Sequence, residues 1–267
     1  MKEHLRQLLA SSTSPLDRRL LAREYLQARL LELLQEQGIF QRAVFLGGTA
    51  LRLLFGLPRF SEALDFSTTG PDSGFPLEAM ATRCARRLTG EGYQVTLKTR
   101  SAVVASCFVR FPALPHELGL SPHAEETLSI KIEVDTNPPR GAVLQSTLVR
   151  RHVLLNLLHH DRASLLAGKL HAVLMRRFTK GRDLYDLLWY LTDPDWPPPN
   201  LELLNNALEQ TSWGGPRLDR GNWRTVLAAR LEDIDWSAAA RDVRPFLERP
   251  GEAAMLTREH VTGLLRR

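Results

Sequence analysis

The stretch VFLGGTALRLLFGLPRFSEALDFS, residues 44–67, contains residue types from which a magnesium-dependent phosphate chemistry could be built. Its end, EALDFS, has the pattern of a strand with Ala63, Asp65 and Ser67 on one face. Nucleotidyl transfer needs two or three carboxylates on Mg²⁺, and a D-x-D spacing on a strand supplies two of them. Here the first of these positions is alanine, and Glu62 points to the opposite face. A single acid on a strand is also typical of an ordinary salt-bridge partner.

A glycine pair, Gly47 and Gly48, separates the short apolar strand AVFL from a helix that we expect to begin at Thr49. Glycines let backbone N–H groups approach an anion at a helix N-terminus, where the helix dipole favours negative charge. Thr49 can cap that helix and can also donate a hydrogen bond to a phosphate. A tight strand-to-helix turn with a threonine cap would explain the same three residues without any ligand.

The segment LSIKIEVD alternates as an amphipathic strand. Its apolar residues share one face, and Lys131, Glu133 and Asp135 share the other. Such a strand with a solvated face is common in antiparallel sheets. In a nucleotidyltransferase, however, this face would supply a carboxylate from the strand beside Asp65.

Two helices in the second half of the chain carry further charged candidates. Lys169 lies beside a broad leucine-rich stripe, where a lysine usually extends its ammonium to water. In RDLYDLL, Arg182, Asp183 and Asp186 fall near the start of a helix, where acids are favoured by the helix dipole. Asp183 as a plain N-cap residue is the simpler interpretation.

These residues need a framework of both strands and helices. We expect an α+β part over residues 1–150, with helices at about 15–37 and 77–88 and a small mixed sheet. A mostly helical part should follow over residues 151–267, because the chain reads as helix from about residue 153. The proline-rich DPDWPPPN should act as a stiff linker, since successive prolines exclude both helix and strand.

Composition excludes several classes of protein. Two cysteines, Cys84 and Cys107, suggest neither a disulfide framework nor a zinc site. No signal-peptide pattern occurs, and no apolar run approaches the ~20 residues of a membrane helix, so we expect a soluble cytoplasmic protein. The formal net charge of +5 fits an ordinary basic surface or a partner that carries phosphates.

The order of these features resembles a known family. The stretches that carry the resemblance are REYLQARLLELL, FLGGTALRLLFGLPRFSEALDFS, LSIKIEVD and LLAGKLHAVLMRRFTKGRDLYDLLWYL. Together they are similar to the AbiEii/AbiGii toxin family of nucleotidyltransferases, which includes the mycobacterial MenT toxins. The likeness covers most of residues 23–191, and no motif is placed after about residue 200.

The resemblance implies a polymerase-beta-like nucleotidyltransferase fold, with the helical part contributing motif residues to the cleft. It implies Mg²⁺-dependent transfer of nucleotides from an NTP to RNA, in some members the 3′ acceptor end of tRNA, which stops aminoacylation and translation. Members are usually encoded with an antitoxin protein that neutralises them.

The same resemblance implies roles for individual residues. Gly48 and Thr49 would hold the triphosphate and Gly47 would shape the turn. Asp65 would be the second acid of the metal pair, with Glu133 the preferred third carboxylate and Asp135 the next choice. Lys169 would contact phosphate charge and Asp183 would be the acid of the last motif, ahead of Asp186. Arg59 and Arg182 would assist on nucleotide or RNA phosphates.

One departure stands out, because the family pattern RFSEDLDF has aspartate where this chain has Ala63. The loss removes one ligand and one negative charge from a Mg²⁺ site, and Mg²⁺ demands near-octahedral oxygen ligation. We expect activity to fall by orders of magnitude while the fold survives. A deliberately disabled variant or a naturally inactive relative would explain it, and we favour the first because the other motif residues are intact.

Three functions therefore follow as hypotheses. The first is an NTP-dependent RNA nucleotidyltransferase toxin that is impaired at Ala63. The second is a non-catalytic relict that binds nucleotide or RNA. The third is a toxin that transfers phosphate from NTP to a protein, as a kinase does.

Overall fold

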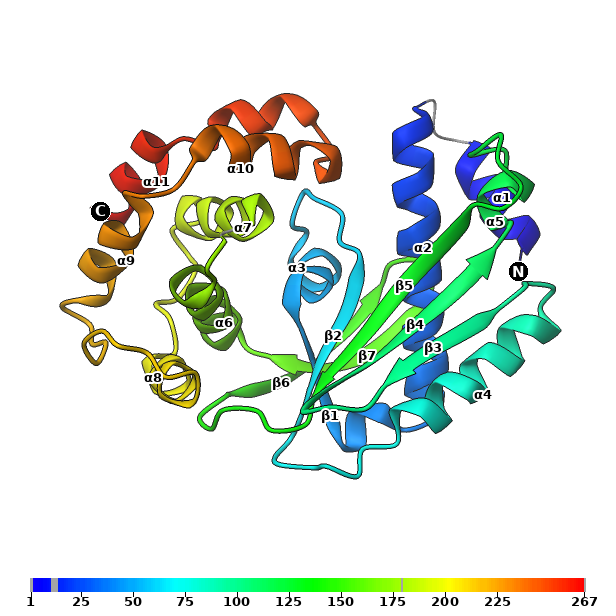
Figure 1. The fold of residues 1–267 in the computed structure, drawn as a ribbon, viewed down its shortest axis with the longest axis horizontal. Coiled ribbons are helices and arrows are strands. Elements are labelled where there is room, and N and C mark those ends of the chain that lie inside the picture. Colours follow the sequence, from blue (N-terminus) through cyan, green and yellow to red (C-terminus); the bar gives the residue numbers. More distant parts are fainter. Residues whose placement is uncertain (1, 11–13, 179, 267) are drawn as a thin grey trace. The chain divides into compact units, whose positions relative to one another are not determined.

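The chain folds into two compact units in the computed structural model, which describes residues 2–10, 14–178 and 180–266 (Figure 1). The first unit contains the sheet and consists of Met1–Leu54, Phe60–Pro138 and Ser146–His159. The second unit is largely helical and consists of Phe55–Arg59, Pro139–Gln145 and His160–Arg267. No helix of the described residues is both long and apolar enough to cross a membrane.

A mixed sheet forms the centre of the first unit. Within the described residues its seven strands follow the order β3-β4-β5-β2-β1-β7-β6. They are β1 (Ala43–Leu46), β2 (Ala63–Thr68), β3 (Thr96–Arg100), β4 (Val104–Pro112), β5 (Thr127–Asp135), β6 (Leu144–Arg150) and β7 (Leu154–His160). Strand β2 pairs antiparallel with β1 and parallel with β5. The predicted α+β class with a mixed sheet is confirmed.

The last two strands, β6 and β7, were not foreseen, and the expectation of helix from about residue 153 was wrong. The LLNLLHH segment is rich in leucine, which favours helix. Its burial nevertheless alternates, with Leu155 and Leu157 buried and Asn156 exposed, as on a strand. Strand β7 pairs with β1, so the first unit extends to His159 and the expected boundary at residue 150 falls inside it.

One face of the sheet is apolar and forms the core. Strand β5 contributes Ile130, Ile132 and Val134 to this face, and all three are fully buried. The face is covered by the helices α2 (Pro15–Glu36) and α4 (Leu77–Gly90), which supply buried leucines and Cys84 to the same core (Figure 1). Burial on this side leaves the alternate residues of β2 and β5 on the opposite, polar face.

Shorter elements complete the first unit. They are α1 (Lys2–Ala10), η1 (Ile39–Gln41), α3 (Gly47–Phe55), whose last residue belongs to the second unit, and α5 (Leu114–Glu117). Helix α3 begins at Gly47, two residues earlier than expected, so Thr49 lies inside the helix and does not cap it. Gly47 itself has φ +81°, a conformation that favours glycine.

The second unit is built around α7 (Gly181–Thr192). Its other helices are α6 (Arg162–Met175), α8 (Leu201–Gln210), α9 (Trp223–Leu231), α10 (Trp236–Val243), η2 (Arg244–Phe246), η3 (Pro250–Met255) and α11 (Arg258–Leu265). Helices α7 and α10 approach closely at Gly181, where an added Cβ would come within 2.8 Å of the Ala239 carbonyl carbon. Lys180 holds the N-cap position of α7, so Asp183 is not the cap residue.

The proline-rich segment 193–200 is neither helix nor strand, as expected, but it does not link two domains. It lies within the second unit, and Trp196 is buried there among aromatic rings. The ring centre of Trp196 lies 5.3 Å from that of Phe55, 5.0 Å from Trp189 and 4.5 Å from Tyr190. The segment is therefore part of the second core.

Candidate functional site

The polar face of the sheet brings together two of the predicted acids. Asp65 on β2 and Glu133 on β5 are direct neighbours in the parallel register of these strands. Adjacent strands lie about 4.8 Å apart, so the two carboxylates can reach a common cation. We call Asp65 and Glu133 the acid pair. Asp135 is two residues further along β5, opposite Ser67, and its Oδ1 accepts a hydrogen bond from the Asn137 N–H at 3.0 Å.

The glycine turn lies directly against this pair. An added Cβ on Gly47 would come within 2.9 Å of the Asp65 Cβ and still closer to its carboxylate oxygen Oδ2. The left-handed backbone and this close approach both require glycine. The sequence predicted the turn and the acid separately, and the structure places them in contact.

Thr49 has a structural task in this arrangement. It is buried, and its hydroxyl donates a hydrogen bond to the Ala63 carbonyl oxygen at 2.5 Å. This bond ties the first turn of α3 to the start of β2. The Thr49 hydroxyl is thus bound within the protein. The group of Thr49 that can donate to an anion at the N-terminus of α3 is its backbone N–H.

Lys131 was not among the predicted site residues, yet it lies beside the acid pair. Its Nζ forms an ion pair with Glu133 Oε1 at 2.7 Å, and in register it is opposite Ala63. An aspartate at position 63 would therefore lie on the same face as Asp65 and next to this ammonium. The described residues contain no group of three or more His, Cys, Asp or Glu side chains that could hold a metal ion.

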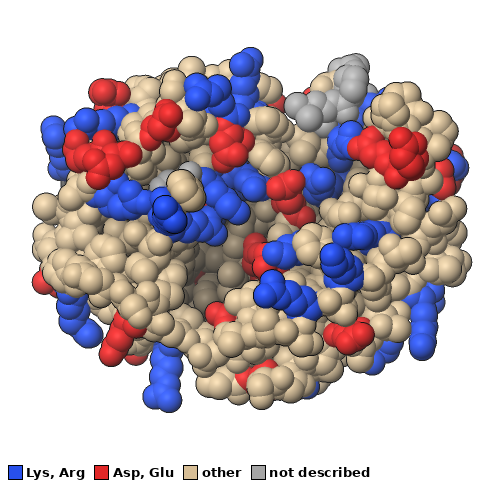
Figure 2. All heavy atoms as spheres, viewed as in Figure 1, with Lys and Arg blue, Asp and Glu red and all other residues tan. Residues whose placement is uncertain are grey.

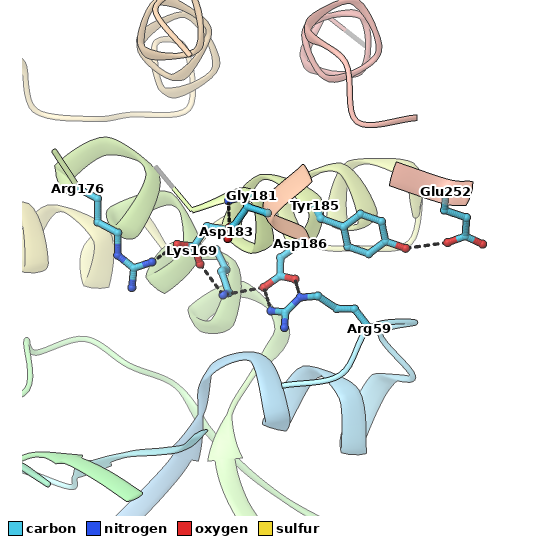
Figure 3. Close-up of polar contacts among 9 residues, drawn as sticks. Arg59, Lys169, Arg176, Gly181, Asp183, Tyr185, Asp186 and Glu252 are labelled. Carbon is cyan, nitrogen blue, oxygen red and sulfur yellow. Dashed lines mark hydrogen bonds and ion pairs between the residues drawn. The ribbon is translucent and has the colours of Figure 1, made fainter. Parts of the chain in front are cut away.

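In the second unit, four of the predicted residues, Arg59, Lys169, Asp183 and Asp186, meet with Arg176 in what we call the buried ion network (Figure 3). Lys169 Nζ lies 2.9 Å from Asp183 Oδ1 and 2.6 Å from Asp186 Oδ2. The lysine therefore binds two carboxylates one helical turn apart on α7, instead of extending to water.

The two aspartates of this network differ in their surroundings. Asp186 is fully buried, and Arg59 holds both of its oxygens, at 2.5 Å and 2.6 Å. Asp183 is paired with Lys169 and with Arg176, whose side chain is 42% exposed. Asp186 is thus enclosed by protein, whereas Asp183 has one partner, Arg176, that reaches toward solvent.

The network favours the charged forms of Asp183 and Lys169. Burial alone would raise the pKa of Asp183, but Lys169 and Arg176 outweigh it and hold that pKa below its usual range. Burial lowers the pKa of Lys169, yet Asp186 and Asp183 together raise it above its ordinary value. Three cations against two carboxylates leave the cluster with a formal charge of +1.

The structure shows what the two predicted helper arginines contact. Arg59 is buried and bound to Asp186, so it supports that acid rather than presenting its guanidinium to a phosphate. Arg182 lies 4.3 Å above the ring centre of Phe246. Arg176 was missed, and only its place shortly before the RD motif could have suggested it.

Comparison with known proteins decides the family. The sequence matches the family described as "Nucleotidyl transferase AbiEii toxin, Type IV TA system" over residues 29–258. This chain belongs to the AbiEii family of nucleotidyltransferase toxins. Comparison with curated proteins gives no match.

Solved structures share the AbiEii-type fold of this chain. A putative nucleotidyltransferase from Helicobacter pylori is 18% identical, with a TM-score of 0.52 and 92% of both chains covered. JHP933 from the same organism is 19% identical, with a TM-score of 0.51 and coverage of 96% of this chain and 92% of that one. MenT4, a nucleotidyltransferase toxin from Mycobacterium tuberculosis, is 18% identical, with a TM-score of 0.51 and coverage of 100% and 99%. At these identities the likeness concerns the fold.

Proposed function

We propose that this AbiEii family member is a toxin built to transfer nucleotides from an NTP to RNA, with the 3′ acceptor end of tRNA as substrate, and that Ala63 impairs it. The acid pair beside the Gly47 turn is the observation that carries the proposal. Nucleotides added to the acceptor end would stop aminoacylation and hence translation. The same order of motifs in the sequence supports this function.

The acid pair fits a Mg²⁺ site in which the substrate supplies the remaining ligands. Mg²⁺ at sites for nucleoside triphosphates is usually held by one or two carboxylates together with the substrate phosphates. Asp65 and Glu133 would hold it, with Asp135 as the next oxygen ligand along β5. When bound, the ion neutralises triphosphate charge and makes the attacking hydroxyl more acidic. Glu133 would exchange its ion pair with Lys131 for this cation.

The N-terminus of α3 would receive the triphosphate. Backbone N–H groups of Gly48 and Thr49 lie in the first turn of this nine-residue helix, where the dipole favours anions. Gly47 leaves space for the Asp65 carboxylate at the same turn. The Thr49 hydroxyl holds β2 in place through the Ala63 carbonyl.

By the resemblance to the family, Lys169 would compensate phosphate charge and Asp183 would be the acid of the last motif. Asp183 is preferred to Asp186, because its partner Arg176 is partly exposed while Asp186 is enclosed. Asp183→Asn in an active background should therefore lower kcat with little loss of stability, relative to Asp186→Asn.

The decisive test restores the missing acid. Ala63→Asp should add label from α-labelled NTP to total tRNA in the presence of Mg²⁺, with each of the four NTPs assayed separately. Ala63→Asn is the matched control, because it has nearly the same size and lacks the charge. Absence of incorporation with every NTP in the Ala63→Asp protein would contradict the proposal. Label transferred to protein from the γ-phosphate would instead indicate a kinase.

A second function is favoured by one observation, Ala63 itself. A relict that binds nucleotide or RNA without turnover needs the fold and the basic surface, but not the full set of acids. It predicts salt-dependent RNA binding, because phosphate contacts release counterions, and no turnover even in Ala63→Asp.

The type IV toxin–antitoxin family also suggests a protein partner. We expect a cognate antitoxin to protect cells that express Ala63→Asp in the cytoplasm. Growth arrest by Ala63→Asp, relieved by co-expression of the antitoxin, would support this part of the proposal, and arrest by Ala63→Asn would contradict it.

A further inference from the structure

The polar face of the sheet carries a second group of side chains beside the acid pair. In register, Lys98 on β3, Phe108 on β4 and Lys131 on β5 form one row across the sheet, which ends at Ala63 on β2. We call Lys98, Phe108 and Lys131 the basic–aromatic row. The next row contains Arg100, Ser106 and the acid pair. Rows two residues apart lie about 6.7 Å from one another.

The middle of the row is an aromatic ring between cations. Lys131 Nζ lies 5.6 Å from the Phe108 ring centre, and Arg110 lies 5.9 Å from it. These distances are near the outer limit of about 6 Å for cation–π contact, so the ring holds the two cations only weakly, and Lys131 is also paired with Glu133. Phe108 is only half-buried, although the neighbouring Cys107 and Val109 are fully buried on the core face.

The cations of this face outnumber what its acids can neutralise. Lys98 and Arg100 are both exposed, and within the described residues neither forms an ion pair. Figure 2 shows several Lys and Arg side chains over the part of the molecule where β4 and β5 lie. A half-exposed aromatic ring beside exposed cations is suited to a ligand that combines flat rings with negative charge.

We propose that the basic–aromatic row binds single-stranded RNA, with one base stacked on Phe108 and the phosphates on Lys98, Arg110 and Lys131. Aromatic side chains on sheet surfaces stack unpaired bases, and the surrounding cations follow the backbone. A paired base cannot stack in this way, so the row selects a single-stranded end. Position 63 lies two strands from Phe108, about 10 Å, so the row directs the strand toward the acid pair.

The claim that the bound strand leads toward the acid pair rests on the proposed function. The binding of RNA to the basic–aromatic row does not, because it requires no catalysis. It can therefore be tested on the chain as it stands, in EDTA and without NTP. The probe is a fluorescein-labelled single-stranded RNA of mixed sequence, with a duplex of the same length for comparison. Fluorescence anisotropy is followed at several salt concentrations.

Phe108→Leu keeps an apolar side chain and removes the ring. It should weaken single-strand binding about 5- to 150-fold, because one stacking contact is lost, and leave the salt dependence unchanged. Lys98→Ala should weaken binding and reduce the slope of log K against log[salt] by about 0.7, the value for one phosphate contact on a single strand. Phe108→Tyr should bind as the unaltered chain does.

The matched control is Arg87→Ala on α4, which removes the same charge from an exposed side chain outside the row. Its binding should be unchanged. Unchanged binding in Phe108→Leu, or equal affinity for duplex and single strand, would overturn the proposal. Circular dichroism must show that each variant remains folded.

The outcome separates this inference from the proposed function. If Ala63→Asp modifies tRNA but Phe108→Leu changes neither binding nor KM, the row does not bind RNA, and the proposed nucleotidyltransferase function is supported. If Phe108→Leu weakens binding and no NTP is ever incorporated, the row binds RNA and the protein is a non-catalytic relict.

Discussion

At the scale of single residues, the molecule depends on close approaches between groups that are distant in sequence. Gly47 lies against Asp65, and Asp186 is held by Arg59, 127 residues away. A side chain added at Gly47 would have no space, and loss of the Asp186 carboxylate would leave Arg59 without this partner. Stability measurements can therefore test the two sites independently of activity.

Gly47→Ala should destabilise the protein by more than Gly56→Ala. Both glycines have positive φ, so both variants incur about 1–2 kcal/mol of backbone strain. Only at Gly47 does the new Cβ meet another side chain, that of Asp65, while nothing lies within 4 Å at Gly56. We expect a further loss of about 1–3 kcal/mol at Gly47 in urea unfolding. Equal losses would show that the approach to Asp65 is unimportant.

Asp186→Asn should cost about 3–5 kcal/mol of unfolding free energy, because it removes the carboxylate that holds buried Arg59 and one of the two carboxylates that bind Lys169. The control is Glu232→Gln, in the ion pair of Glu232 with Arg258, where both side chains are nearly half exposed. That variant should change stability by less than about 1 kcal/mol. Similar effects of both substitutions would contradict the importance of the buried ion network.

At the scale of elements, buried charges also join helices to strands in the first unit. Glu24 on α2 is 2% exposed. It forms ion pairs with Arg52 on α3 and with Arg151, and a hydrogen bond with His152, both in the β6–β7 turn. Burial alone would raise the pKa of Glu24, but these partners lower it to about 2. The folded-state pKa is therefore depressed below that of the unfolded chain.

Glu24 should consequently make the fold acid-sensitive. Its contribution is fully present above pH 4.5 and is lost as the pH falls toward 2, with a total of about 3 kcal/mol from the difference between these two pKa values. Glu24→Gln should lower stability at pH 7 and flatten the pH dependence between these limits. Glu3→Gln, at an exposed acid of α1, should leave the dependence unchanged. A wild-type slope in Glu24→Gln would refute the assignment.

Elements with clear alternation were predictable, and their pairing was not. Residues 127–135 showed Lys131, Glu133 and Asp135 on one face from sequence alone, because the apolar residues between them are the core. The parallel pairing of β2 with β5 joins segments almost seventy residues apart, and no local pattern encodes it. The contact of Gly47 with Asp65 depends on the antiparallel pairing of β1 with β2, so it was invisible as well.

The ion network illustrates the same limit in the second unit. Sequence spacing placed Asp183 and Asp186 on one side of a helix, one turn apart. It could not show that Arg59 would reach Asp186 or that Lys169 would be buried, because those contacts come from tertiary packing. Most charged residues of the network could thus be picked out from the sequence, whereas their partners depend on tertiary packing.

At the scale of the whole molecule, the two units contain different side chains whose exposure can be followed during unfolding. Both cysteines lie in the first unit, where burial raises the pKa of Cys84 and of Cys107 to about 11. All five tryptophans, at positions 189, 196, 213, 223 and 236, lie in the second unit. Thiol labelling therefore reports on the first unit, and tryptophan fluorescence reports on the second.

We expect the two probes to show coincident urea midpoints. Strand β6 contains residues of both units, and Phe55–Arg59 belongs to the second unit between two segments of the first, so opening either unit disturbs the other. Asp186→Asn should lower both midpoints together, although the thiols lie outside its unit. Two separate transitions, with only the fluorescence midpoint shifted by Asp186→Asn, would contradict this coupling.

The interleaved connectivity has a practical consequence for dissection of the gene. A fragment that begins at His160 contains every helix from α6 to α11 but omits Arg59, so the carboxylate of Asp186 would be enclosed with Lys169 alone. A fragment that ends at residue 150 loses β7, which pairs with β1 on the side opposite to β2. Neither half can be excised as one contiguous piece, and activity is therefore to be mapped by point substitution rather than by truncation.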